Sequence, residues 1–229
     1  MRLSIRIILI VTIIIFSFLN TEAQIIKGAA ILGFNASQVD GDEVYGFHKY
    51  GFNVGASAIL PFGKEKRWNL VIETIFNQKG AYEKESPSID TLATPYYNLR
   101  LNYMEVPVLL NYVDKNGLTF GLGFSWGRLV SVKEIEHGKE ISSTTITGPY
   151  NRNDFNFLAE LRFRLYKQLK FNLRYAYTIT PIRTRTFVNP TTGVSWERTQ
   201  YNNLFSIRLI YVFNEPSQDS EAKKRFKQP

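Results

Sequence analysis

The sequence predicts an all-β fold, an eight-stranded antiparallel up-and-down transmembrane β-barrel. Three observations predict it. The N-terminus has the pattern of a secretory signal, so the chain is exported. Beyond the signal, apolar and polar residues alternate with a period of two rather than 3.6. The connections between the alternating segments are long and short in turn, as expected for strands that rise and fall across a membrane.

Residues 1–23 are predicted to be a signal peptide. Arg2 and Arg6 give it a positive start, an apolar run follows, and small residues precede the predicted cleavage between Ala23 and Gln24. The apolar run is too short and wrongly flanked for a stable membrane span, although an uncleaved anchor is the alternative. No cysteine follows the run, which excludes a lipoprotein.

The composition excludes several kinds of site. The chain of 229 residues has no cysteine and two histidines. A disulfide scaffold, a cysteine-ligated metal site and a thiol nucleophile are therefore excluded. We expect no cofactor and no metal. The net charge of +8 is spread along an exported chain, so we expect no nucleic-acid partner.

The clearest alternation lies in residues 154–166. Phe155 and Phe163 fall on one face, and Glu160 and Arg162 fall on the other. Segments of the same kind recur along the chain. The predicted strands are residues 26–37, 50–60, 68–78, 97–112, 118–127, 154–166, 170–181 and 200–213.

One predicted strand changes parity. Its apolar residues occupy odd positions up to Tyr103 and even positions from Met104 onward. A one-residue slip of this kind is what a β-bulge produces, so we expect a bulge in residues 97–112, just before Pro107.

The connections set the orientation. Residues 38–49, 79–96, 128–153 and 182–199 form long connections, whereas residues 61–67, 113–117 and 167–169 form short ones. Because the first connection is long, both termini lie at the short-turn end, which is periplasmic in outer-membrane barrels. We therefore expect a barrel domain at residues 24–213 and a flexible periplasmic tail at residues 214–229.

A soluble barrel of lipocalin type is the alternative, because alternation alone does not say which face is outside. Two features favour the membrane. The polar face is rich in Arg, Asn, Ser and Gly but poor in Lys, unlike a typical water-facing sheet. The apolar face is heavily aromatic, with Tyr and Trp near the segment ends, as in interfacial girdles.

The chain also resembles a known family over roughly residues 24–213. Its most specific segments are residues 28–37, 50–55, 72–80 and 101–110, the last containing Tyr103, Glu105 and Pro107. These resemble the Bacteroidota-type outer-membrane β-barrel proteins labelled porin-family or PorT-like. The resemblance implies the barrel fold, and it leaves the physiological role open.

Charged residues on the predicted inner face form the first candidate site. An eight-stranded barrel is just wide enough for its own side chains, so these charges would pair and fill the lumen. Either they form a plug, which we favour, or they line an ion-selective pore. The predicted lumen network is Glu73, Arg100, Glu105, Glu160, Arg162, Arg164, Arg174 and Arg208.

Basic residues of the long connections form the second candidate site, a rim that would contact lipopolysaccharide phosphates or an acidic glycan. A solvated loop face is the alternative. The residues are Lys133, Lys139, Arg152, Arg183, Arg185 and Arg198. In addition, Asp90, Thr91 and Leu92 resemble a short O-glycosylation sequence.

The predicted function is a monomeric outer-membrane barrel with a structural or binding role, in which the extracellular loops carry recognition. A small diffusion pore and an accessory subunit of a secretion or assembly complex are alternatives. The third alternative is an acyltransferase or hydrolase at the rim of the barrel. The loops contain residues of the types such an enzyme needs, but their spacing does not support a catalytic site, so no catalytic residue is assigned. These residues are His48, His137, Ser142, Ser143 and Asp154.

Overall fold

The computed structural model describes residues 26–84, 96–141, 143–189, 191–213 and 215. The predicted cleavage between Ala23 and Gln24, the glycosylation of Thr91 and the tail beyond residue 215 concern residues outside this set. Among the described residues, no helix has the length and apolar character needed to cross a membrane.

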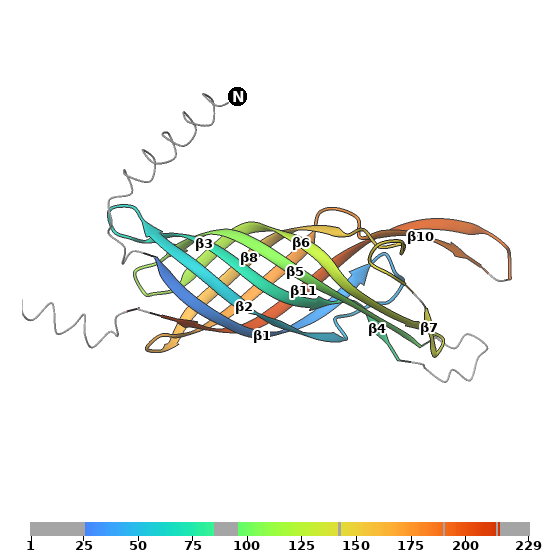
Figure 1. Ribbon diagram of the computed structural model, residues 1–229, viewed down its shortest axis with the longest axis horizontal. Helices are drawn as coiled ribbons and strands as arrows, with labels where there is room; N and C mark the ends of the chain where they lie inside the picture. The colour runs from blue at the N-terminus through green and yellow to red at the C-terminus, as the bar shows by residue number, and fades with distance from the viewer. Residues whose placement is uncertain (1–25, 85–95, 142, 190, 214, 216–229) are drawn as a thin grey trace, which may run out of the picture.

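Eight long strands close into one antiparallel ring (Figure 1). Each long strand pairs with the next one along the chain, and the last pairs back with the first. The predicted eight-stranded up-and-down barrel is therefore confirmed. The ring strands are β1 (Lys27–Asp40), β2 (Lys49–Phe62), β3 (Trp68–Lys79), β5 (Tyr97–Val113), β6 (Thr119–Glu136), β8 (Asn153–Tyr166), β9 (Leu169–Thr178) and β11 (Ser195–Val212).

The long connections contain further strands that the sequence analysis left as loops. They are β4 (Tyr82–Glu83), β7 (Lys139–Ile141) and β10 (Arg183–Val188). β10 pairs with the N-terminal part of β11, residues 195–200, and this two-stranded ribbon extends beyond the ring (Figure 1). The prediction that residues 182–199 form only a loop is wrong, because backbone pairing continues above the ring.

A bulge occurs at the predicted place, because the pairing of β5 with β6 shifts register between Asn102 and Tyr103, but the predicted change of parity within β5 is wrong. Odd-numbered residues of β5 stay buried from Tyr97 to Asn111, so the strand keeps one parity throughout. The register shift lies on the partner strand, where Asn102 pairs with Ser131 and Tyr103 with Leu129. The apolar pattern changes sides because the inner face is apolar near the long loops and polar in the middle of the barrel.

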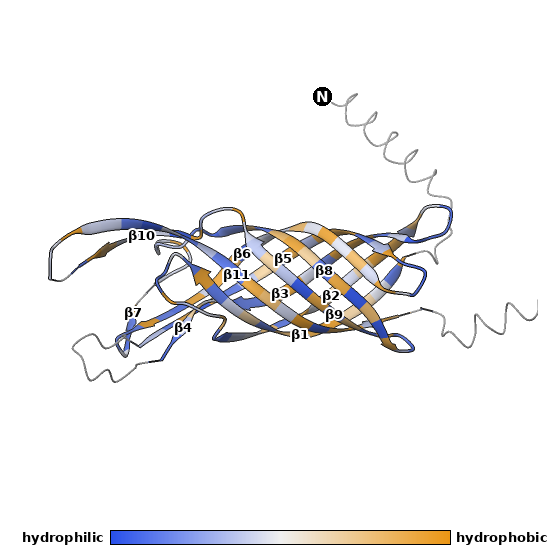
Figure 2. Ribbon diagram, turned by 180° about the vertical axis from the view of Figure 1, so that it is seen from behind, coloured by the Kyte–Doolittle hydropathy of each residue, from blue (hydrophilic) through white to orange (hydrophobic). Residues whose placement is uncertain are grey.

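The outer face carries an apolar belt around the middle of the barrel (Figure 2). Leu32, Phe124 and Ile207, from three different strands, have exposed fractions of 56%, 60% and 56%. A continuous apolar surface of this extent is unfavourable in water and matches the hydrocarbon layer of a membrane. It favours the membrane barrel over the soluble alternative.

Candidate functional site

Two carboxylates and three guanidinium groups meet in the lumen. Arg174 binds Glu73 through two hydrogen bonds, of 2.8 Å from Nη1 to Oε2 and 2.9 Å from Nη2 to Oε1. Arg208 bridges both acids, with Nη1 3.0 Å from Oε2 of Glu73 and Nη2 2.9 Å from Oε2 of Glu160. Arg162 donates to Oε1 of Glu160 at 2.8 Å. We call these five residues the lumen cluster.

The lumen cluster is almost sealed from solvent. Its exposed fractions are 0% for Arg208, 1% for Glu73, 3% for Arg162 and Arg174, and 4% for Glu160. Its members come from β3, β8, β9 and β11, and β3 stands opposite β9 in the ring. The ion pairs therefore cross-link the two sides of the barrel through its centre.

A second group of buried charges lies around Lys79, which the sequence analysis had placed in a loop. Its Nζ is 2.7 Å from Oε1 of Glu105 and 2.8 Å from Oδ2 of Asp154. Nζ also lies 5.1 Å from the centre of the Tyr103 ring. The alternation through residues 73, 75 and 77 was the signal that could have placed Lys79 inside. Of the predicted network, Glu105 thus belongs to this second group.

A third buried group closes the lumen at the end of the barrel that carries the long connections. Arg183 donates to both carboxylate oxygens of Glu134 at 3.1 Å, and Tyr97 donates to Glu134 at 3.1 Å. The guanidinium of Arg183 also lies 4.5 Å from the centre of the Tyr150 ring. The prediction that Arg183 contributes to an exposed basic rim is wrong, because its side chain is buried and neutralised by Glu134.

The mouth of the barrel at the short-turn end is closed by Glu215, a residue of the predicted tail. Its carboxylate is 2.9 Å from Nζ of Lys170 and 3.3 Å from both Nζ of Lys27 and Nη2 of Arg164. Burial would raise the pKa of Glu215, but Lys170, Lys27 and Arg164 together lower it below its usual value. Arg164, predicted for the lumen network, therefore lies at the mouth and pairs with this residue.

Arg100 does not join the buried charges. Its side chain is exposed on the outer face, where Arg100 pairs in register with Lys133 of β6. Its assignment to the lumen depended on the parity change in β5, which does not occur. The prediction that Arg100 belongs to the lumen network is wrong for this reason.

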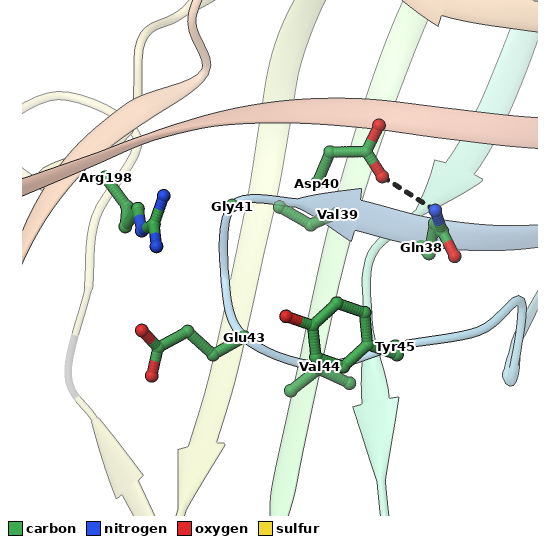
Figure 3. Close-up of a pocket in the computed structure, with 8 residues that line it drawn as sticks. All are labelled: Gln38, Val39, Asp40, Gly41, Glu43, Val44, Tyr45 and Arg198. Atoms are coloured by element: carbon green, nitrogen blue, oxygen red, sulfur yellow. Dashed lines mark hydrogen bonds between the residues drawn. The ribbon is translucent and has the colours of Figure 1, made fainter.

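Of the remaining rim residues, Arg185 and Arg198 lie directly across from each other in the ribbon of β10 and β11. Lys133 is 3.2 Å from Glu140, and Arg185 is 2.7 Å from Glu136. Lys139 and Arg152 are exposed. The last of the set, Arg198, lines a pocket of about 650 Å³ between β11 and the loop that joins β1 to β2 (Figure 3). The pocket residues are Gln38, Val39, Asp40, Gly41, Glu43, Val44, Tyr45 and Arg198.

The candidate hydrolase residues are not assembled into a site. Asp154 lies inside the barrel, where it binds Lys79 and accepts a hydrogen bond of 3.2 Å from Asn202. His48 belongs to the β1–β2 loop, and His137 to the turn between β6 and β7. Ser142 is outside the described residues. Among the described residues, no group of three His, Asp or Glu side chains is placed to hold a metal ion.

The sequence profile of a family described as "Outer membrane protein beta-barrel domain" matches residues 29–183, more than half of the chain. The chain belongs to this family. The protein is thus an outer-membrane β-barrel, and its predicted localisation in the outer membrane is confirmed.

The solved structures to which the chain is similar include three proteins of other bacteria. The attachment invasion locus protein Ail of Yersinia pestis is 15% identical over 82% of this chain and 99% of its own, with a TM-score of 0.45. Neisserial surface protein A is 10% identical over 81% and 95%, with a TM-score of 0.44. OprG of Pseudomonas aeruginosa is 13% identical over 82% and 94%, with a TM-score of 0.37. No curated protein matches the chain.

Proposed function

We propose that this outer-membrane barrel is a surface-displayed binding protein whose lumen does not conduct. The lumen cluster carries the proposal. The lining charges of a pore face a water-filled channel, whereas here each charge is paired and at most 4% exposed. The buried groups around Lys79 and Arg183 block the lumen between the cluster and the long loops. Glu215 blocks it at the short-turn end.

The extracellular side supplies the surface for recognition. The ribbon of β10 and β11 and the loop between β1 and β2 extend beyond the apolar belt, where a partner outside the cell can reach them. Loops on a rigid scaffold commonly carry binding residues. We propose that the barrel is monomeric and that the exposed basic residues, such as Arg152 and Lys139, contact lipopolysaccharide phosphates.

A role as an accessory subunit of a secretion or assembly complex is the second candidate. It is supported by the resemblance of residues 72–80 and 101–110 to PorT-like proteins. A closed lumen and a displayed surface are compatible with both the binding role and the accessory role. Chemical cross-linking in native membranes distinguishes them, since an accessory subunit gives a defined larger adduct.

Planar-bilayer recording tests the closed lumen. We expect no stable conductance from the wild-type protein and an increase in the Glu160→Gln variant, because the lost charge frees the guanidinium groups that block the passage. Leu161→Val, a change on the lipid face, is the matched control. A wild-type protein that conducts as a stable open channel, with the Glu160 variant altering only ion selectivity, would establish the diffusion pore instead.

A further inference from the structure

We propose that the pocket between β11 and the β1–β2 loop binds a sugar that carries a carboxylate group. This deepens the proposed function, on which it rests, by naming the ligand class of the extracellular surface. Arg198 would bind the carboxylate, the acids of the loop would accept hydrogen bonds from the hydroxyls, and Tyr45 would cover the apolar face of the sugar ring.

The charge of Arg198 is the first observation. Arg198 lies directly across from Arg185 in the ribbon, and Arg185 is neutralised by Glu136 at 2.7 Å. Within the described part of the chain, the side chain of Arg198 makes no hydrogen bond or ion pair. Like charges directly opposite each other on paired strands are unfavourable. An anion at Arg198 would relieve this repulsion, and a carboxylate fits the guanidinium fork in bidentate fashion.

The loop that faces Arg198 is held in place before any ligand binds. Gln38 donates to Oδ1 of Asp40 at 2.7 Å and accepts from the backbone N–H of Gly46 at 3.1 Å. Trp196 of the ribbon donates to Oε1 of Glu43 at 3.0 Å. A site fixed in advance loses less conformational entropy on binding, so these contacts favour recognition.

The backbone of the loop is fixed where it approaches the strand. Gly41 has a φ of 87°, and a β-carbon there would collide with the carbonyl oxygen of Thr199. The loop therefore packs directly against β11, and the pocket walls come from two segments far apart in the chain (Figure 3).

The remaining pocket groups match a hydroxyl-rich ligand. Oε2 of Glu43 is left to accept a hydrogen bond, and Arg198 can donate several. Tyr45 is 83% exposed and lines the same pocket. Figure 3 shows Arg198 on one wall, with Glu43 and Tyr45 on the loop opposite. A volume of about 650 Å³ suits one or two sugar rings.

Isothermal titration of the full chain in detergent tests the site, with methyl glucuronide as the probe and methyl glucoside as its uncharged counterpart. We expect the glucuronide to bind about tenfold more tightly, and Arg198→Gln to remove this difference, because a charge-assisted hydrogen bond is lost. Tyr45→Ala should weaken both glycosides, whereas Tyr45→Phe should retain binding. Lys115→Gln, which removes an exposed positive charge in the turn between β5 and β6, outside the pocket, is the control and should bind like the wild type.

Several results would overturn the proposal. These are no saturable binding of the glucuronide, equal binding of both glycosides by the wild type, or an unchanged preference in the Arg198 variant. Displacement by inorganic phosphate as effective as by the glucuronide would make Arg198 a general anion site and would also overturn it. If the protein binds neither glycoside and also does not conduct, this inference is contradicted but the proposed function is not. The bilayer recording tests the proposed function separately.

Discussion

Single residues decide whether the lumen charges balance. In the lumen cluster, two carboxylates pair with three guanidinium groups, and Glu160 contacts all three of them within 2.9 Å. Removing one partner from a buried ion pair leaves an uncompensated charge, which costs more than the pair itself contributes. The stability of the barrel is therefore most sensitive at the acids.

Replacing Glu160 with Gln should lower the thermal unfolding temperature of the folded barrel. The expected loss in the free energy of unfolding is about 3 kcal/mol, because three guanidinium groups remain buried with one carboxylate between them. The measurement is the temperature at which the heat-modifiable band shifts on a gel. Leu161→Val, on the lipid-facing side of the same strand, should shift this temperature far less. Equal shifts in the two variants would mean that the cluster does not stabilise the barrel.

Asp42, in the β1–β2 loop, gives a pH dependence outside the membrane. Burial raises the pKa of its carboxyl from 3.8 to about 7, although the backbone N–H of Val44 and the charge of Arg183 oppose the shift, and Asp40 adds to it. A raised pKa means that the folded state holds the proton more tightly than the unfolded state. This contribution to stability is present below pH 3.8 and is lost as the pH rises through about 7.

Hydrogen exchange of the amides in residues 41–46 checks this. In the wild type, the loop should be better protected at pH 5 than at pH 8, after correction for intrinsic exchange rates. Asp42→Asn should abolish the difference, because the amide does not ionise. Asp114→Asn, in a turn at the opposite end of the barrel, should leave the wild-type difference intact. An Asp42→Asn variant that keeps the pH dependence would assign it to another group.

At the scale of a strand, the sequence predicts the structure correctly where one face of the strand is turned towards lipid. Leu161 and Phe163 contact lipid while Glu160 and Arg162 pair inside, so alternation locates β8 correctly. Between the apolar belt and the long loops, the inner face becomes apolar and the outer face polar. The alternation of apolar and polar residues is therefore inverted there, although the geometry of the strand is unchanged. This inversion is the reason for the wrong parity change predicted in β5, the wrong side predicted for Arg100 and the strands of the long connections that were not predicted.

Ion pairs between residues that are distant in the chain are the second feature that could not be predicted from the sequence. Arg183 looked like a basic loop residue because Glu134, its neutralising partner, is 49 positions away. Lys79 looked like the start of a loop although its partner Asp154 is 75 positions away. The charged face of each ring strand was evident from the pattern, but which charges meet depends on the register around the closed barrel, which no local pattern encodes.

The glycine face of β6 gives a prediction at this scale. A β-carbon at Gly123 would lie 2.7 Å from the Cα of Leu109 on the neighbouring strand, too close without moving the backbone. Gly123→Ala should therefore destabilise the barrel by about 2 kcal/mol, in the range of overpacking changes. The unfolding temperature in detergent is the measurement. Leu122→Val, on the lipid face next to it, is the control; a Gly123 variant as stable as this control would show that β5 and β6 can separate without cost.

The orientation of the whole molecule can be tested because the chain has no cysteine. Single cysteines at Thr192, in the tip of the ribbon, and at Lys115, in the turn between β5 and β6, are both exposed. On intact cells, a membrane-impermeant maleimide should label the first and not the second, until the outer membrane is breached. A tag after Pro229 should behave like the cysteine at Lys115. Labelling in the reverse pattern would mean that the barrel is inserted the other way round.

The separation of the lumen partners along the chain also has a consequence for biogenesis. Glu73 acquires Arg174 from 101 positions downstream and Arg208 from 135 positions downstream, on the strand that closes the ring. An emerging chain therefore crosses the periplasm with these charges solvated, and the early hairpins cannot bury Glu73 favourably by themselves. The pairs that Arg208 forms with both acids require the arrival of the last strand. Closure of the seam and final entry into the bilayer are then one concerted event, and a chain truncated before Arg208 would remain with the periplasmic chaperones.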